Sequence, residues 1–397
     1  MMRTRGTLGL AVAMVLLATA CAGPAASPSA APSSGPTNAP TNGATTPPTA
    51  APTATAAPTA GELTHVRLQL QWVTQSQFAG YFAAVDQGFY EAEGLDVEIL
   101  QGAVEIVPQT VVASGSAEFG LAWLPKVLAS IEEGADLVNI AQVFQRSGTL
   151  EVAWADSGIT TPEDWRGKRV GTWGYGNEHE LFAAMRKVGI DPENPADVTI
   201  ISQDFTMDSL LNNDLDAAEA MIYNEYAQVL EHTNPDTGEL YTPEDLSVIS
   251  MESAGTAMLQ DGIFASSAWL AEEGNEDIAT RFLRASFKGW MWCRDNFDDC
   301  VQVVLDNGPT LGAGHQTWQL NEINALIWPS PAGIGTMDAD AFDRTVQVAL
   351  EGQIITADPP DTVYRTDLAE AARQGLDGDV NGASYTKQVV EVVEGGN

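Results

Sequence analysis

The sequence has few of the residues that build metal centres. Its 397 residues include 3 Cys and 4 His. These are too scattered to form a ligand cluster, so we expect neither a metal nor a cofactor. It also has no Ser/His/Asp arrangement and no phosphate-binding loop of the kinds that recur in enzymes. The sequence therefore predicts a protein that is not an enzyme.

Positive charge is scarce as well. Residues 61–397 carry a net charge of −38, from 16 Lys and Arg against 54 Asp and Glu. Such an acidic body repels phosphate backbones and anionic lipid surfaces, so we expect no nucleic-acid partner. A neutral or weakly charged ligand fits this composition better than a full anion. The alternative is that the acidity only keeps the protein soluble.

The apolar run near the start of the chain is short. Leu8–Ala20 cannot cross a membrane as a mature helix, but it follows two arginines, as in a signal peptide, which we place at residues 1–20. The run ends in Leu-Ala-Thr-Ala-Cys, which resembles a lipobox. We therefore expect cleavage before Cys21 and lipid attachment to its sulfur. An ordinary secretory signal followed by a free Cys is the alternative.

The next segment lacks charged and aromatic residues altogether. Residues 22–60 consist almost wholly of Ala, Pro, Ser, Thr, Gly and Asn. Such a composition cannot bury enough apolar surface to offset the entropy of ordering it, so it predicts a disordered tether over residues 21–61. The expected location is thus the cell membrane, with the chain anchored through Cys21 and its body outside the cytoplasm.

The remainder alternates strand-like and helix-like segments. Val66, Leu68 and Leu70 have the period of a half-buried strand. A helical pattern over 78–90 and a second strand over 95–100 complete a βαβ unit. Further strands are predicted at 117–121, 138–144, 169–172, 198–202 and 218–222. This alternation predicts an α/β fold with mainly parallel sheets, in which ligands bind at the carboxyl ends of strands.

The βαβ segment resembles the start of the NMT1/THI5-like periplasmic-type solute-binding proteins. The likeness rests on Trp72 after the first strand and on Gly-Phe-Tyr-Glu-Ala-Glu-Gly-Leu-Asp-Val-Glu-Ile at residues 88–99. It extends from about residue 64 to about residue 368. It implies a two-lobe periplasmic-binding-protein-like fold of type II, with a mainly parallel sheet in each lobe and the ligand in the cleft between them.

The chain of such a protein crosses twice between its lobes. We place the crossings near residues 150–156 and 255–263. The predicted divisions are lobe one at 62–153 plus 260–370, lobe two at 154–259, and a mobile acidic C-terminal tail at 371–397. The resemblance also implies a membrane-embedded ABC permease as partner, and we expect a monomer.

Three segments, 72–81, 170–178 and 216–225, should line the cleft. Trp72 and Tyr81 offer faces for stacking a flat ring, whereas Phe78 and Phe82 should lie in the core. The predicted ligand-binding residues are Trp72, Gln75, Gln77, Tyr81, Trp123, Trp173, Tyr175, Asn177, Glu219, Tyr223 and Asn224.

Some of these choices have open alternatives. Gln75 and Gln77 can donate and accept hydrogen bonds. Trp173 could instead pack inward within a glycine-rich turn. Glu219, an acid inside a strand, should either bond an N–H of the ligand or pair with a cation or face solvent. The loop and helix start at 308–318 is expected to be structural.

Two cysteines remain besides Cys21. Cys293 and Cys300 stand close together in the sequence, and in an oxidising compartment a disulfide between them is expected; two buried thiols are the alternative. Residues 377–382 resemble the front of a calcium loop, but the twelfth position is Gln388 rather than Glu, so we expect no metal there.

These features together predict the solute-capturing lipoprotein of an ABC importer. The superfamily includes binders of thiamine's pyrimidine precursors and riboflavin-binding lipoproteins. The number of aromatic side chains in the expected cleft suits a broad tricyclic ring, so we expect riboflavin. A pyrimidine precursor is the alternative, and an enzyme of thiamine pyrimidine synthesis is a third hypothesis.

Overall fold

The predicted βαβ unit opens the part of the chain that the computed structural model describes, residues 63–395. Strands β1 (Thr64–Gln69) and β2 (Leu95–Leu100) pair in parallel. The connecting helix is not continuous, because α1 (Ala79–Asp86) ends before Gly88, whose φ of 67° starts the short helix α2 (Phe89–Ala92). The predicted signal peptide, Cys21 and tether lie outside the described residues.

The first sheet combines strands from both ends of the body. Its order is β2-β1-β3-β10-β4, with β3 at Phe119–Ala122, β4 at Val138–Gln142 and β10 at Gly262–Ala265. β3 runs parallel to β1, whereas β10 runs antiparallel to both β3 and β4.

The remaining strands belong to the segment between β4 and β10. β5 (Thr149–Trp154) lies between β8 (Ala218–Met221) and β9 (Leu246–Ser250) and is antiparallel to both. β6 (Arg169–Thr172) and β7 (Thr199–Ser202) pair in parallel. A parallel bridge from β6 to the residue before β8 connects these two small sheets. We call them together the second sheet system, and the five-stranded sheet the first.

Each sheet system therefore has one strand that runs against the others. β5 and β10 are the two strands that the chain enters from the other sheet system, after β4 and after β9. A strand entered in this way runs away from the junction, while its neighbours run toward it. The predicted α/β fold with largely parallel sheets is confirmed, and the two exceptions follow from the crossings. The lobe boundaries themselves remain a prediction.

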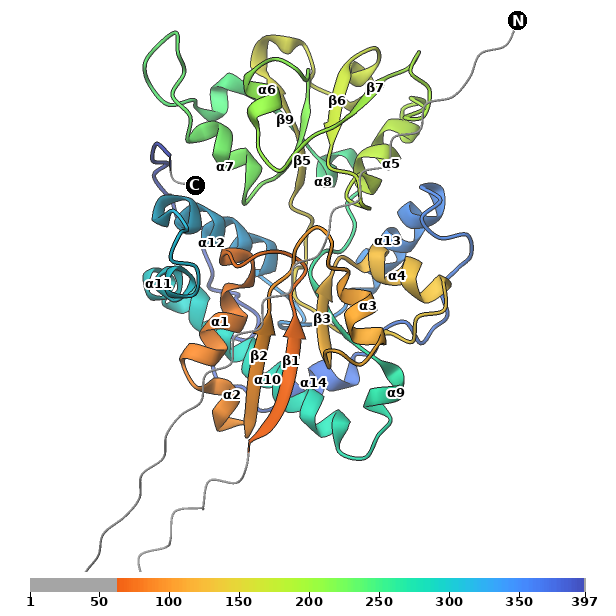
Figure 1. Cartoon of the computed structure of the whole chain (residues 1–397), viewed down its shortest axis with the longest axis vertical. Helices are drawn as coiled ribbons and strands as arrows, with labels where there is room; N and C mark the ends of the chain where they lie inside the picture. Colours follow the sequence, from red (N-terminus) through yellow and green to blue (C-terminus); the bar gives the residue numbers. More distant parts are fainter. Residues whose placement is uncertain (1–62, 396–397) are drawn as a thin grey trace, which may run out of the picture. The chain divides into compact units, whose positions relative to one another are not determined.

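Helices cover both sheet systems, as Figure 1 shows, and all described residues lie in one compact unit. Among these residues, no helix is long and apolar enough to span a membrane. The other helices are η1 (Ser76–Phe78), α3 (Pro108–Ala113), α4 (Leu124–Glu132), η2 (Ala155–Ser157), η3 (Pro162–Trp165), α5 (His179–Lys187), α6 (Asp208–Leu211), α7 (Glu225–Leu230), η4 (Pro243–Asp245), α8 (Met251–Ala254), α9 (Ser267–Leu270), α10 (Asn275–Asp295), α11 (Phe297–Asn307), α12 (Ala313–Ile327), α13 (Ala339–Glu351) and α14 (Asp367–Arg373).

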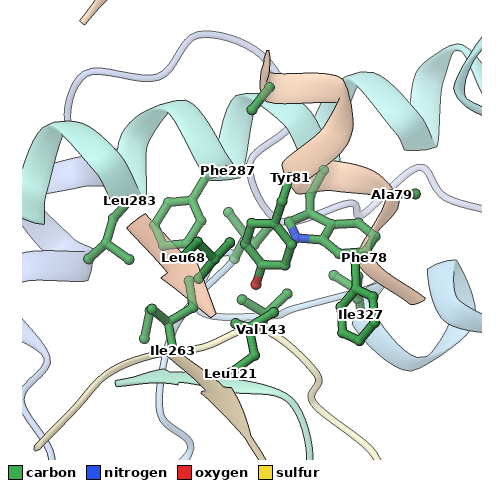
Figure 2. Packing of buried hydrophobic residues seen from close by; sticks show 14 of the residues in the cluster. Leu68, Phe78, Ala79, Tyr81, Leu121, Val143, Ile263, Leu283, Phe287 and Ile327 are labelled. Atoms are coloured by element: carbon green, nitrogen blue, oxygen red, sulfur yellow. The ribbon is translucent and has the colours of Figure 1, made fainter. Parts of the chain in front are cut away.

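The main core lies where α10 packs against α1 and the first sheet. The two helices approach closely because both contact points are glycines: a Cβ on Gly289 would collide with the carbonyl oxygen of Gly80. Phe78 and Phe82 lie in this core, as predicted. Figure 2 shows Tyr81 there too, among Leu68, Ile263 and Phe287.

The C-terminal segment is packed against the body, so the expectation of a mobile tail is wrong. α14 spans its predicted start at residue 371. The carbonyl oxygens of Val380 and Asn381 accept backbone hydrogen bonds from the loop after α12. The amide group of Asn321 on α12 bonds the main chain of Gln388 at both ends, at 3.0 and 3.1 Å. These paired backbone groups outweigh the acidic composition that suggested mobility.

Cys293 and Cys300 form a disulfide that joins the end of α10 to α11, with their Cα atoms 5.0 Å apart. Both residues are fully buried in the main core. The link therefore ties two core helices together at a point that does not line the cavity described next.

Candidate functional site

A cavity of about 420 Å³ opens where strands of both sheet systems end. Trp72, Trp123, Trp173 and Tyr223 each follow the carboxyl end of a strand, namely β1, β3, β6 and β8, and all four line the cavity. This volume lies within the range of small-molecule sites in proteins. The lining includes nine of the eleven predicted residues, so strand ends were a sound guide: Trp72, Gln75, Gln77, Trp123, Trp173, Tyr175, Asn177, Tyr223 and Asn224.

Tyr81 does not line the cavity, contrary to the prediction. Its ring packs edge-on against Trp290 of α10, with centroids 5.6 Å apart and planes at 84°. The side chain is 2% exposed. The residue lies on the face of α1 that packs on α10, so its apolar ring contributes to the core rather than to a stacking surface.

Glu219 also lies outside the lining, fully buried within β8. Its carboxyl group accepts hydrogen bonds from the hydroxyl of Thr172 at 2.6 Å and from the backbone N–H of Trp173 at 3.1 Å. Burial raises the pKa of Glu219 to about 8. Glu219 therefore neither faces solvent nor pairs with a cation, and its carboxyl group is buried away from the cavity. Glu219 instead supports the turn that carries Trp173.

Aromatic side chains from both sheet systems meet in the cavity. Phe205 lies 4.7 Å from Trp72 between ring centroids, tilted at 54°, and 6.4 Å from Trp173, nearly parallel at 18°. The sequence analysis missed Phe205, which stands alone in a polar stretch. Its signal was its place just beyond the carboxyl end of β7. Flat aromatic groups suit such a wall, because stacked and tilted ring pairs are favourable at these separations.

A buried acid organises the polar wall of the cavity. The carboxylate of Asp261 accepts a hydrogen bond from Nε2 of Gln71 at 2.5 Å and another from Nε2 of Gln77 at 2.9 Å. Gln77 in turn accepts from Nε2 of Gln75 at 2.7 Å. Burial raises the pKa of Asp261 to about 6, while the two amide N–H groups that its oxygens accept favour the ionised form. The sequence analysis missed Asp261 and Gln71, which are far apart in the chain.

Lys126 on α4 also lines the cavity. Its ammonium donates to Oδ1 of Asn177 at 2.8 Å and lies 5.0 Å from the ring centroid of Trp123. Burial lowers the pKa of Lys126 to about 8. Asn177 follows β6 and Lys126 follows β3, so this hydrogen bond joins the two sheet systems beside the exposed ring of Tyr175. The sequence analysis did not identify Lys126.

A second polar connection involves Asn224 and Glu225, which also line the cavity. Nδ2 of Asn224 donates to Oε1 of Glu225 at 2.7 Å, and burial raises the pKa of Glu225 to about 7. Oδ1 of Asn224 lies 2.8 Å from Nε2 of His315 on α12, and Nδ1 of that ring lies 2.9 Å from Glu231. The segment 308–318, expected to be structural, thus contributes a buried support for a cavity residue. Within residues 63–395 no group of three or more His, Cys, Asp or Glu could hold a metal.

The crossing pattern and the cavity at the strand ends define the periplasmic-binding-protein fold. The chain belongs to the NMT1/THI5-like family, whose sequence model matches residues 75–299. The chain is also similar to the solved periplasmic aliphatic sulphonate binding protein SsuA of Escherichia coli, with a TM-score of 0.55 and 15% identity over 74% of this chain and 89% of that one. At that identity the likeness concerns the fold alone.

Two curated relatives share a higher sequence identity with this chain. The formylaminopyrimidine-binding protein of Halalkalibacterium halodurans is 26% identical over 62% of this chain and 71% of its own length. The riboflavin-binding protein RibY of Chloroflexus aurantiacus is 26% identical over 74% of this chain and 83% of its own length. The equal identities favour neither ligand.

Proposed function

We propose that this protein is the solute-binding lipoprotein of an ABC import system, that it captures riboflavin in the cavity between its lobes, and that it delivers the vitamin to a membrane permease. The anchor would be the lipid on Cys21 and the tether the segment up to residue 61. Both belong to the predictions from the sequence.

The observation that carries the choice of riboflavin is the aromatic wall. Trp72, Phe205 and Trp173 form a continuous series of rings, and a tricyclic isoalloxazine can contact more than one of them at once. Each additional ring contact adds on the order of 1 kcal/mol beyond area burial. A cavity of about 420 Å³ would be left partly unfilled by a single pyrimidine ring.

A pyrimidine precursor of thiamine is the second candidate, and the similarity to the formylaminopyrimidine-binding protein favours it. A full anion such as a sulfonate fits less well. Among the described residues that line the cavity, Lys126 is the one Lys or Arg, and its ammonium already bonds Asn177.

A fluorescence titration tests this proposal. Riboflavin emission is followed as the chain from residue 22 onward is added, and a hydroxymethylpyrimidine is then used as competitor. Saturable quenching at submicromolar concentration, without competition, is the expected result. Absence of quenching, together with heat released when the pyrimidine is added in calorimetry, would assign the protein to the pyrimidine ligands instead.

A further inference from the structure

We infer that Asp261, acting through Gln71 and Gln77, sets the hydrogen-bond polarity of one cavity wall, so that this wall accepts hydrogen bonds and selects ligands with N–H or O–H donors at that edge. This inference rests on the proposed function, because it concerns how the same cavity chooses its ligand. Asp261 is a positioning residue, since it acts through the glutamines.

The polarity follows from the chemistry of a carboxylate. An ionised Asp can only accept hydrogen bonds, whereas a Gln side chain carries a donor end and an acceptor end. Gln71 and Gln77 must therefore turn their NH2 groups toward Asp261, at 2.5 and 2.9 Å. Their carbonyl oxygens then point away from the acid.

The orientation passes on to a third side chain. Because Oε1 of Gln77 faces Gln75, Gln75 must present its NH2 group there, at 2.7 Å. Both ends of the Gln77 amide are then engaged, so Gln77 transmits orientation rather than contacting ligand. Gln71 and Gln75 line the cavity, and no described residue donates a hydrogen bond to Oε1 of either one. These two oxygens are the acceptors that the wall offers.

Contacts within the protein hold this wall in place. Asp261 is 3% exposed, lies in the crossing between β9 and β10, and has a φ of 35°. On the other side, the backbone N–H of Ser76 donates to Oε1 of Gln316 at 2.8 Å, and its hydroxyl donates to the carbonyl of Gln316 at 2.9 Å. This anchors the segment that carries Gln75 and Gln77 to α12. A fixed wall cannot turn its amides to suit a ligand without breaking these bonds.

The inference narrows the class of ligand. An isoalloxazine has an imide N–H, and a 4-aminopyrimidine has an exocyclic amino group, so either can donate to this wall. A sulfonate presents only acceptors and would leave the glutamine oxygens unpaired next to a buried negative charge. Loss of such a buried hydrogen bond lowers affinity far more than loss of an apolar contact.

Paired ligands that differ by one N–H test the inference. Calorimetry with the chain from residue 22 onward compares riboflavin with 3-methylriboflavin, and a 4-aminopyrimidine with its dimethylamino analogue. We expect N-methylation to lower affinity for the wild type at least about tenfold. In Asp261→Asn the new side chain donates a hydrogen bond to one glutamine, whose amide must then rotate so that its oxygen faces residue 261. The ratio of the affinity for the N–H ligand to that for its N-methyl analogue should therefore fall toward one.

The change in this affinity ratio distinguishes a lost hydrogen bond from a steric clash with the added methyl group. A steric clash with the added methyl group would persist in Asp261→Asn, whereas a lost hydrogen bond would no longer matter there. Glu322→Gln is the matched control, because Glu322 is a buried acid that bonds Lys387 and does not line the cavity; its preference should match the wild type. Gln77→Leu breaks the link to Gln75 and serves if Asp261→Asn does not fold.

The outcomes distinguish this inference from the proposed function. If riboflavin binds and its N-methyl analogue binds equally well, the inference is overturned while the proposed ligand stands. If only the aminopyrimidine binds, and it binds more tightly than its dimethylamino analogue, the inference about the wall is supported and riboflavin is the wrong ligand. The inference also fails if Asp261→Asn keeps the wild-type ratio of affinities for N–H and N-methyl ligands. It fails as well if N-methylation changes the affinity of neither heterocycle.

Discussion

Glu151 on β5 and Glu219 on β8 lie directly opposite each other, and both carboxyl groups are buried. Within the described residues neither oxygen of Glu151 has a hydrogen-bond partner, and Oε1 of Glu219 has none either. Burial, and then the mutual proximity of the two acids, raises the pKa of Glu151 well above its usual range. The pKa of Glu219 rises to about 8. The folded protein therefore binds protons here that the unfolded chain releases above about pH 4.5.

The first prediction is that stability falls as pH rises from about 5 to about 8.5. A raised folded-state pKa means that the native state binds more protons across this window, so deprotonation favours unfolding. Glu180 and Glu225, whose pKa values burial raises to about 7, act in the same direction. Thermal unfolding at several pH values should show the decline, with a smaller slope for Glu151→Gln. An equal slope in that variant would show that the pair is not responsible.

The second prediction concerns the aromatic wall. Trp72→Ala and Trp173→Ala should each weaken ligand binding at least about tenfold, because each removes a large ring that lines the cavity. Tyr81→Phe is the control and should leave affinity unchanged, since that side chain lies in the core. Affinities come from the riboflavin titration. Unchanged affinity in both tryptophan variants would refute this site.

The third prediction concerns the hydrogen bond between Lys126 and Asn177. This contact joins the two sheet systems across residues that line the cavity, so Asn177→Ala should speed ligand release by roughly tenfold. Stopped-flow displacement measures the rate. Lys187→Met is a suitable control, because among the described residues that lysine bonds only two backbone carbonyls at the end of α8, outside the cavity lining. A release rate equal to wild type in Asn177→Ala would mean that the contact does not limit opening.

The fourth prediction concerns the disulfide. Cys293 and Cys300 are seven residues apart, and closing so short a loop stabilises a protein by roughly 2–3 kcal/mol in the chain-entropy treatment. Replacing both by Ser should lower the free energy of unfolding by about this amount in a denaturant titration. Ligand affinity should stay the same, since neither residue lines the cavity. Two free thiols per wild-type chain in a non-reducing thiol count would contradict the premise.

Much of the local architecture could be predicted because it depends on neighbouring residues. The period of apolar positions identified β2 and β6 with the bounds that the structure has, and strand ends located Trp72, Trp123 and Trp173 at the cavity. A strand that ends in a loop delivers the next side chain to the edge of its sheet wherever that sheet is packed. Strand bounds and the residues that follow strand ends can therefore be predicted without knowing which segments pack against them.

The tertiary structure alone decided which side chains face the cavity and which way their amides point. Tyr81, which was expected at the cavity, lies in the core, whereas Phe205, which the sequence analysis missed, lines the cavity, because helix packing and loop position set which ring meets it. Asp261 stands 190 residues from Gln71 and 184 from Gln77 in the sequence. A glutamine carries a donor and an acceptor in equal measure, so its sequence position does not determine which end is free. The charge of a distant carboxylate makes that choice once folding has brought it within hydrogen-bond reach.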